Sequence, residues 1–393
     1  MRTKTFFLII LTVFFSEFSY SQIEILQKNI KIDTVRFAPE YVLGGEVGEL
    51  TSNLEYIPLN TEKKPVISKI EDVAFTKNRV VVLDYENGLF IFSSKDGKLI
   101  NCILGVPING KKSSIIRFTI FEDQINLLSS LTESGKSITY LSKVDLDGKI
   151  KSTSIKTQIN SINDSLKIKD DVYYFNQIGD KFGNKTLLTL NNRDLIKISD
   201  SSQVNWMLLN RVYPFSKNLN KDKHSYFSIW CDYRIFELSE TGIDKITQFI
   251  LPIENTIEYS KVISFKNLDE FEKNNEKNYL ISQGLDNIQP YGERLLFYYL
   301  GNPSKNIIYN AQEQSFLSLN NILPDKSNNF LPIIGEFGHE YFYSCGEYLY
   351  SFLYPNQINS TIEKLKKDGN NVSKQVIGLS KHNNPILVKF KLK

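Results

Sequence analysis

The chain has 393 residues, of which 41% are hydrophobic, and it carries 47 lysines and arginines against 44 aspartates and glutamates. That apolar content is enough to bury a substantial core in one large β domain or in two or three smaller domains. The near-neutral charge balance excludes an electrostatic field that would favour nucleic acid as a partner.

The first 21 residues have the pattern of a secretory signal peptide. Two basic residues, Arg2 and Lys4, precede a largely apolar run over 5–15. Glu17 interrupts this run before it reaches the roughly 18 to 20 residues of a transmembrane helix. We expect cleavage after Ser21 and a periplasmic or secreted mature chain with no transmembrane segment. No cysteine lies at the cleavage point, so no lipid anchor is expected.

After residue 70 the chain reads as a succession of short strands with little helix. Apolar runs of four to eight residues, rich in Val, Ile, Leu and Phe, are separated by Asn, Gly and Asp. They cover 79–85, 88–94 and 98–104, and the scheme repeats from 115 to 156. A meander of about four short strands is the natural unit.

Hairpin turns recur at a regular interval. FSSKDGKLI (92–100) and KVDLDGKIK (143–151) carry their turn glycines, Gly97 and Gly148, 51 residues apart. Later turns are expected near Asn192, Gly242 and Glu313, at intervals of 44, 50 and 71 residues. The polar, helix-prone segment 264–280 accounts for the long interval as an insertion. Repeats of about 40 to 50 residues with four strands each are the signature of β-propeller blades.

The ends of the chain complete the predicted ring. Two strands are expected within 338–355, a short helix over 356–369 and a final strand over 384–393. The strand 28–37 is expected to pair with that final strand and close the ring, which removes the exposed sheet edges. The sequence therefore predicts an all-β, six-bladed β-propeller in one domain, 22–393, with a helical insertion in blade 5 and a short helix in blade 6.

The region 53–105 has a recognisable pattern: a YIPL strand, an IxxI strand, a VxVxD strand and an IxxFxxxGKxI hairpin. With 226–252 and the closing NPILVKFKLK (384–393), it resembles the bacterial exported six-bladed β-propellers, which are related to NHL-type propellers. The resemblance implies fold and export, but this family has no generally assigned activity. GVPINGKKSS (105–114) stands where family members often carry a G-x-GPxE turn.

In a propeller, the loops between second and third strands and between successive blades share one face around the central channel. This loop face is expected to include segments near 84–88, 106–114, 178–185, 199–206 and 231–234, with mixed charge. The candidate ligand-binding residues there are Tyr85, Phe182, Trp206, Tyr233 and Arg234. The aromatic members could stack on a sugar ring or a peptide side chain. Each could equally be a loop anchor packed on its blade.

Catalytic and metal-binding motifs are weak in this sequence. His224, His339 and His382 lack the spacing of a metal motif. DLDG (145–148) resembles the start of a calcium loop, but the acidic ligands that should follow are absent, so we predict a turn. There is no G-x-S-x-G elbow, and LGGEVGE (43–49) lacks the lysine of a P-loop. No catalytic residue, metal ligand or cofactor is therefore assigned.

Cysteines and clustered aromatic residues favour structural roles. Cys102, Cys231 and Cys345 lie more than a hundred residues apart, and buried free thiols are favoured over one disulfide with a free thiol. The stripe EYFYSCGEYLYSFLY (340–354) is interpreted as packing between blades rather than as a carbohydrate platform.

Two functional hypotheses remain. The first is an exported, non-catalytic binding module, expected to be monomeric, that recognises a glycan, peptide or protein through the loop face. The second is a propeller hydrolase or lyase with its site at the channel mouth, where carboxylates or histidines from different blades would converge within about 4 Å.

Overall fold

The structure is a computed structural model. It describes residues 23–61, 65–84, 86–121, 124–133, 136–152, 155–156, 162–168, 171–176, 186–191, 193–198, 224–229, 232–257, 270, 273, 282–335 and 341–393. The predicted signal peptide lies outside these residues, as does most of the predicted insertion at 264–280. Within that insertion only Glu270 and Lys273 are described, and both are helical.

Sheets 1 to 3 come first along the chain. Sheet 1 consists of β5 (Ile70–Phe75), β6 (Arg79–Asp84), β7 (Gly88–Ser93) and β8 (Leu99–Ile103). Sheet 2 consists of β11 (Ser114–Phe121), β12 (Gln124–Glu133), β13 (Lys136–Asp145) and β14 (Ile155–Lys156). Sheet 3 consists of β15 (Ile162–Ile168), β16 (Asp171–Asn176), β17 (Thr186–Leu190) and β18 (Arg193–Ile198), with β1 (Ile23–Ile25) as a fifth strand.

Sheets 4 to 6 complete the set. Sheet 4 consists of β19 (Ser225–Ser228), β20 (Arg234–Leu238), β21 (Ile243–Ile250) and β2 (Lys31–Arg36). Sheet 5 consists of β22 (Leu285–Tyr291), β23 (Arg294–Tyr299), β24 (Lys305–Asn310) and β25 (Ser315–Ser318). Sheet 6 consists of β27 (Tyr343–Cys345), β28 (Tyr348–Leu353), β29 (Ile386–Leu392) and β4 (Thr51–Pro58).

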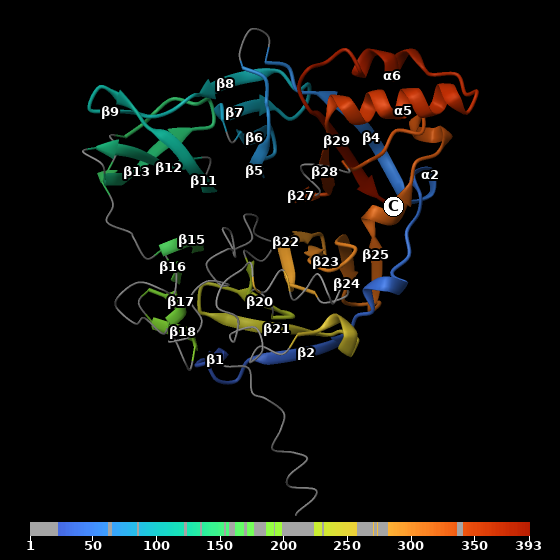
Figure 1. Cartoon of the computed structure of the whole chain (residues 1–393). Helices are drawn as coiled ribbons and strands as arrows, with labels where there is room; N and C mark the ends of the chain where they lie inside the picture. The colour runs from blue at the N-terminus through green and yellow to red at the C-terminus, as the bar shows by residue number, and fades with distance from the viewer. Residues whose placement is uncertain are drawn as a thin grey trace, which may run out of the picture.

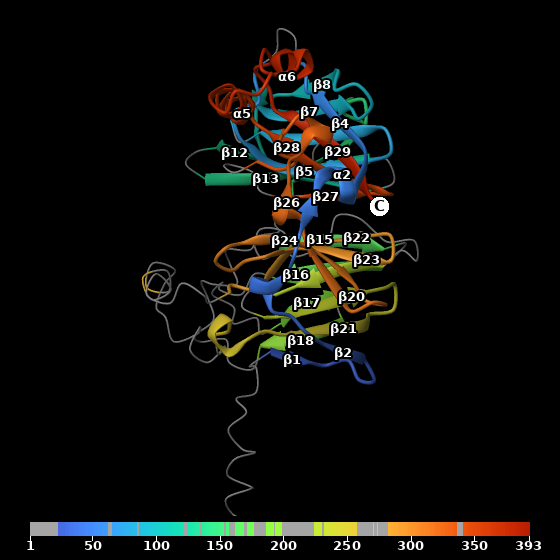
Figure 2. The ribbon, with the colours of Figure 1, turned by 90° about the vertical axis from the view of Figure 1, so that its right-hand side faces the viewer.

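The sheets follow one another in chain order around a common centre (Figure 1). In the perpendicular view the strands are seen lengthwise (Figure 2). Two short ribbons lie beside them, β9 (Pro107–Ile108) with β10 (Lys111–Lys112), and β3 (Gly45–Glu46) with β26 (Ile322–Leu323). Within each sheet, consecutive strands along the chain pair antiparallel, as a meander requires.

The main core lies between neighbouring sheets, so a central strand is buried on both of its faces. In β6, Val80, Val81, Val82 and Leu83 are all at most 2% exposed. The aromatic stripe belongs to this core. Tyr350 of sheet 6 stacks on Phe75 of sheet 1 with ring centroids 4.3 Å apart. The interpretation of the stripe as inter-sheet packing is therefore confirmed.

Two helices cover one end of sheet 6. The helix expected over 356–369 is present as α5 (Pro355–Lys367), and a second helix, α6 (Lys374–Leu379), was not expected. Proline is well placed in the first turn of α5. Ile358, Ile362 and Leu365 lie on one face of α5 and are buried against the core of sheets 5 and 6.

Short helical turns join the remaining elements. They are η1 (Pro39–Tyr41), α2 (Val47–Leu50), η3 (Ile253–Asn255), η4 (Leu319–Asn321) and η5 (Lys326–Asn328).

Ring closure differs from the prediction. The expected strand 28–37 forms as β2, but it pairs in parallel with β21 of sheet 4. The strand beside β29 is β4, which pairs with it antiparallel. The physical reason is burial. At the end of β2, Val35 and Phe37 enter the core between sheets 4 and 5, whereas Ile57 of β4 enters the core between sheets 6 and 1.

Residues 23–58 thus form an N-terminal arm along the outside of four sheets (Figure 1). The arm adds β1 to sheet 3, β2 to sheet 4 and β4 to sheet 6. Beside sheet 5, the Leu43 carbonyl accepts a hydrogen bond from the Ser318 backbone N–H at 2.9 Å. Segments hundreds of residues apart in sequence are fastened together in this way.

Candidate functional site: the loop face

Two of the five candidate residues can be placed. Tyr233 and Arg234 lie at the start of β20, in the connection from β19. Tyr85, Phe182 and Trp206 fall outside the described residues. The structure therefore shows only what the pair in sheet 4 does.

Tyr233 joins two loops. Its hydroxyl donates to the Ser282 carbonyl at 3.0 Å and accepts from the Ile257 backbone N–H at 3.2 Å. Its ring is partly buried against the core between sheets 4 and 5. These contacts are those of a loop anchor, because the hydroxyl satisfies backbone groups of two segments 25 residues apart in the sequence.

Arg234 forms a local ion pair with Asp232. The Arg234 Nε atom lies 2.8 and 3.0 Å from the two carboxylate oxygens, and Nη2 lies 2.5 Å from Oδ2. Asp232 is only 8% exposed, so water screens this pair weakly. The guanidinium carbon also lies 5.4 Å from the centroid of the Phe236 ring. The pair fixes the loop that carries Tyr233.

Asp84 binds loop backbone groups in sheet 1, at the same end of the strands as Tyr233 and Arg234 in sheet 4. Its carboxylate accepts from the backbone N–H groups of Ser68, Lys69, Glu86 and Asn87 at 2.6 to 3.0 Å. The residue is 1% exposed. A buried carboxylate that accepts from four backbone N–H groups fixes the chain around it. Sequence analysis placed Asp84 on the loop face but could not show this role.

A polar cluster fastens the arm to the loops of sheets 4 and 5. Asn255 Nδ2 donates to Glu40 Oε1 at 2.6 Å, and the buried Lys305 ammonium donates to the Pro39 carbonyl at 2.8 Å. The Asn255 carbonyl in turn accepts from the Ser282 N–H at 2.8 Å. No sequence signal pointed to this cluster, because Glu40 and Asn255 are 215 residues apart.

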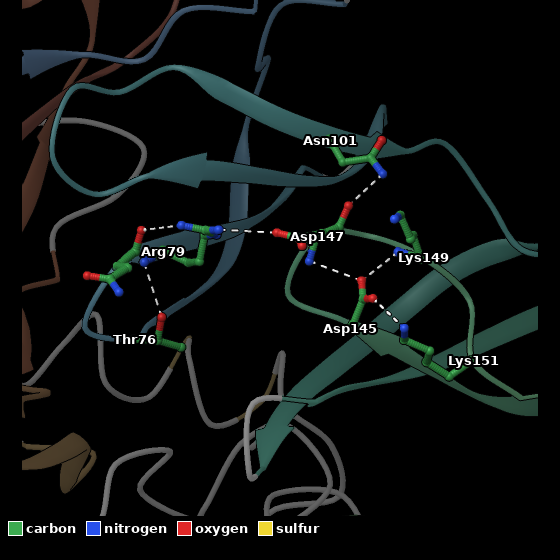
Figure 3. Close-up of polar contacts among 8 residues, drawn as sticks. Thr76, Arg79, Asn101, Asp145, Asp147, Lys149 and Lys151 are labelled. Carbon is green, nitrogen blue, oxygen red and sulfur yellow. Dashed lines mark hydrogen bonds and ion pairs between the residues drawn. The ribbon is translucent and has the colours of Figure 1, made fainter.

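At the opposite end of the strands, the DLDG segment forms the predicted turn and locks sheet 2 to sheet 1 (Figure 3). Asn101 Nδ2 of β8 donates to the Asp147 carbonyl at 2.9 Å, and Arg79 Nη2 donates to Asp147 Oδ1 at 3.1 Å. Hydrogen bonding from Lys151, and then from the Lys149 backbone, lowers the pKa of Asp145. The carboxylates here shape the turn.

His224 lies between two carboxylates in sheet 4. Its Nδ1 atom is 2.7 Å from Glu237 Oε1, and its Nε2 atom is 3.4 Å from Asp244 Oδ2. The carboxylates contact opposite ring nitrogens, so the three side chains do not converge on one point. His339 lies outside the described residues, and the backbone N–H of His382 donates to the Leu379 carbonyl. Within the described residues, no group of three or more His, Cys, Asp or Glu side chains is placed to hold a metal ion.

Two of the three cysteines can be placed. Cys102 and Cys345 both pack on the core between sheets 6 and 1. Burial raises the pKa of Cys345. Cys231 lies outside the described residues.

Among the described residues, every helix is too short or too polar to cross a bilayer.

Comparisons with known proteins identify the fold. No protein-family model and no curated protein matches the sequence. Among solved structures, the chain is similar to a presumed exported protein of Bacteroides fragilis, with 15% identity and a TM-score of 0.60. That match covers 92% of this chain and all of the other.

Weaker similarities extend to two further proteins. Streptogramin B lyase, a β-propeller protein, has 11% identity and a TM-score of 0.36, covering 77% of this chain and 80% of the lyase. PorZ, a surface component of the type-IX secretion system of Porphyromonas gingivalis, has 12% identity and a TM-score of 0.33. That match covers 76% of this chain and 32% of PorZ. The chain is mostly β, with several four-stranded antiparallel sheets, and its structural neighbours are β-propellers.

Proposed function

We propose that the mature chain, 22–393, is a six-bladed β-propeller that is exported to the periplasm or cell exterior and binds a glycan, peptide or protein through its loop face. Sheets 1 to 6 are then its blades. The proposal includes Tyr85, Phe182 and Trp206 as aromatic contacts for the ligand, with Tyr233 and Arg234 beside them. The leader pattern of residues 1–21 and the similarity to a presumed exported protein support export.

The observation that carries the proposal is the tethering of the loop face. Asp84 holds four backbone N–H groups, Asp232 holds Arg234, and the Tyr233 hydroxyl joins two loops. Polar side chains used in this way stabilise a fixed loop shape. A fixed surface loses less conformational entropy on binding, which favours recognition of a ligand.

A thermal-shift screen of the mature chain tests the binding function. The panel contains oligosaccharides, peptidoglycan fragments, short peptides, calcium, zinc and EDTA. A ligand at a hundred times its dissociation constant stabilises the native state by about 2.7 kcal/mol, which raises Tm by about 3 °C for a chain of this length. A saccharide or peptide that raises Tm supports the proposal and identifies the ligand class.

Three variants then locate the site. Tyr85→Ala, Phe182→Ala and Trp206→Ala should each weaken binding of the identified ligand, whereas Tyr348→Ala, at the start of β28 in sheet 6, should not. If Tyr348→Ala weakens binding as much as the other three, the loop face is the wrong site. Loss of stability in EDTA, or turnover of a panel compound, would replace the binding module with a metal-dependent or catalytic protein.

A further inference from the structure

Three exposed apolar side chains stand out on the N-terminal arm and its neighbour. Ile253 is 88% exposed, Tyr41 is 81% exposed and Leu43 is 76% exposed. These are the highest values among the exposed large hydrophobic residues that the structure describes. Single exposed apolar residues are ordinary, but a group of them marks a surface that another molecule covers.

The three residues lie on adjacent segments. Tyr41 ends η1 and Ile253 begins η3, and these turns are joined by the 2.6 Å hydrogen bond from Asn255 to Glu40. The blue segment after β2 lies beside the gold turn after β21 in both views (Figures 1 and 2). We call Tyr41, Leu43 and Ile253 the apolar rim.

The backbone beneath the apolar rim is firmly held. Val42, between Tyr41 and Leu43, is 6% exposed and packs in the core between sheets 4 and 5. Its carbonyl accepts from Asn321 Nδ2 at 2.9 Å, and the Leu43 carbonyl accepts from the Ser318 N–H at 2.9 Å. The rim side chains therefore project from a backbone that need not reorganise when a partner binds, which reduces the entropic cost of association.

The charged residues that adjoin the apolar rim in the chain are acidic. The segments 38–50 and 251–257 contain four charged residues, all of them exposed glutamates: Glu40, Glu46, Glu49 and Glu254. Glu40 and Glu254 adjoin Tyr41 and Ile253 in the chain, whereas the part of the border with Glu46 and Glu49 also receives a cation, because Lys393 Nζ donates to the Gly48 carbonyl at 2.5 Å. The neighbouring Lys305 is buried and directs its ammonium to the Pro39 carbonyl. An acidic border favours a partner of opposite charge and disfavours a like-charged one.

We propose that the apolar rim is a docking surface for a protein partner, distinct from the ligand contacts proposed at Tyr85, Phe182 and Trp206. The partner presents aliphatic or aromatic side chains flanked by lysine or arginine. Its apolar side chains cover Tyr41, Leu43 and Ile253, and its cationic groups face the glutamates of the border.

Selection of displayed 12-residue random peptides on the immobilised mature chain tests this inference. The selected peptides should be enriched in Lys or Arg together with Leu, Ile, Phe, Tyr or Trp. Their affinity should fall at least tenfold for Tyr41→Ser/Leu43→Ser/Ile253→Ser. It should be unchanged for the comparison variant Ile100→Ser/Leu104→Ser/Ile150→Ser. These sites are 36 to 43% exposed; Ile100 lies in β8, Leu104 follows β8 and Ile150 follows the Asp147 turn.

The charge contribution has its own control. Glu46→Gln/Glu254→Gln should weaken binding severalfold at low salt, and the difference from the unsubstituted chain should shrink at high salt, because added ions screen surface charges. An unchanged Tm shows that each variant is folded.

The inference is overturned if no peptide is enriched, if enriched peptides are not basic, or if they bind the triple rim variant equally well. Concentration-dependent dimerisation that the rim variant abolishes would also overturn it, since the occupant would then be a second copy. None of these results depends on the loop-face ligand.

Discussion

Phe37 shows how a single residue of the arm holds two sheets together. Its ring is 1% exposed and lies 4.9 to 5.9 Å, between centroids, from the rings of Phe316, Tyr299, Phe297 and Phe249. Phe37→Ala should lower the free energy of unfolding by about 3 to 5 kcal/mol, because it removes buried area and leaves a cavity. Urea denaturation followed by circular dichroism measures the change.

Ile32 is the matched control on the same arm. It is 57% exposed, so Ile32→Ala should change the free energy of unfolding by less than about 0.5 kcal/mol. Equal losses in the two variants would mean that the arm contributes through its strand pairing and not through the Phe37 ring.

Tyr299 makes stability sensitive to alkali. Burial raises the pKa of its hydroxyl to about 12, whereas an unfolded tyrosine titrates near 10. The stability from keeping this group neutral is complete below pH 10 and is lost as the pH rises from 10 to 12, because only the unfolded state ionises there. Tyr299→Phe should therefore reduce the loss of unfolding free energy over this range by up to about 2 kcal/mol.

The neutral-pH behaviour of Tyr299→Phe is the control. Among the described residues the buried hydroxyl makes no hydrogen bond of full geometry, so its removal should leave stability at pH 7 unchanged or slightly higher. Denaturant titrations at pH 7, 9, 10 and 11 compare the two proteins. Parallel pH profiles would show that Tyr299 does not carry the alkaline effect.

At the scale of elements, the repeated hairpin turns that carry Gly97 and Gly148 each lie in close contact with the neighbouring sheet. Gly97 and Gly148 have φ of +68° and +81°. A Cβ on Gly97 would overlap the Pro58 carbonyl oxygen of sheet 6, and one on Gly148 would overlap the Asn101 side chain of sheet 1. Gly110 offers the matched comparison, since its φ is +75° and nothing lies within 4 Å of its Cβ position.

The three Gly→Ala variants should therefore rank in stability. Gly110→Ala bears only the left-handed strain, about 1 kcal/mol. Gly148→Ala adds the displacement of a side chain, and Gly97→Ala adds about 1 to 3 kcal/mol more because a backbone carbonyl must move. Thermal unfolding orders the Tm values as Gly110, Gly148 and Gly97, from highest to lowest. Equal losses would mean that the turns do not bear on the adjacent sheets.

The same elements show what the sequence could predict. Turn spacing and strand periodicity are local signals, so the meanders, the DLDG turn and helix α5 could be foreseen. The partner of strand 28–37 could not, because β2 pairs with residues more than two hundred positions away and several sheets offer an outer edge. Likewise Tyr233 and Asp84 could be assigned to the loop face, but their roles depend on distant backbone groups such as the Ser282 carbonyl and the Ser68 N–H.

At the scale of the whole molecule, the sheets differ in whether the described arm contacts them. It pairs directly with sheets 3, 4 and 6 and bonds to sheet 5, and just beyond its end Asn60 forms a bridge with Lys98 beside sheet 1. The described contacts of the arm do not include sheet 2. Among the described residues, sheet 2 is held chiefly by the core shared with sheet 1 and by the Asp147 turn.

Sheet 2 should therefore open before the rest of the ring. Local opening free energies vary across a structure and are lowest where the fewest stabilising contacts hold an element. Native-state hydrogen exchange at increasing urea should give a lower opening free energy for the amides of β12 and β13 than for those of β21 and β29. Phe37→Ala should lower the values for β21 and leave those for β12 and β13 nearly unchanged, because the Phe37 ring packs between sheets 4 and 5. If all four strands exchange through one common opening, before and after the substitution, the arm fastens the molecule as a single cooperative unit.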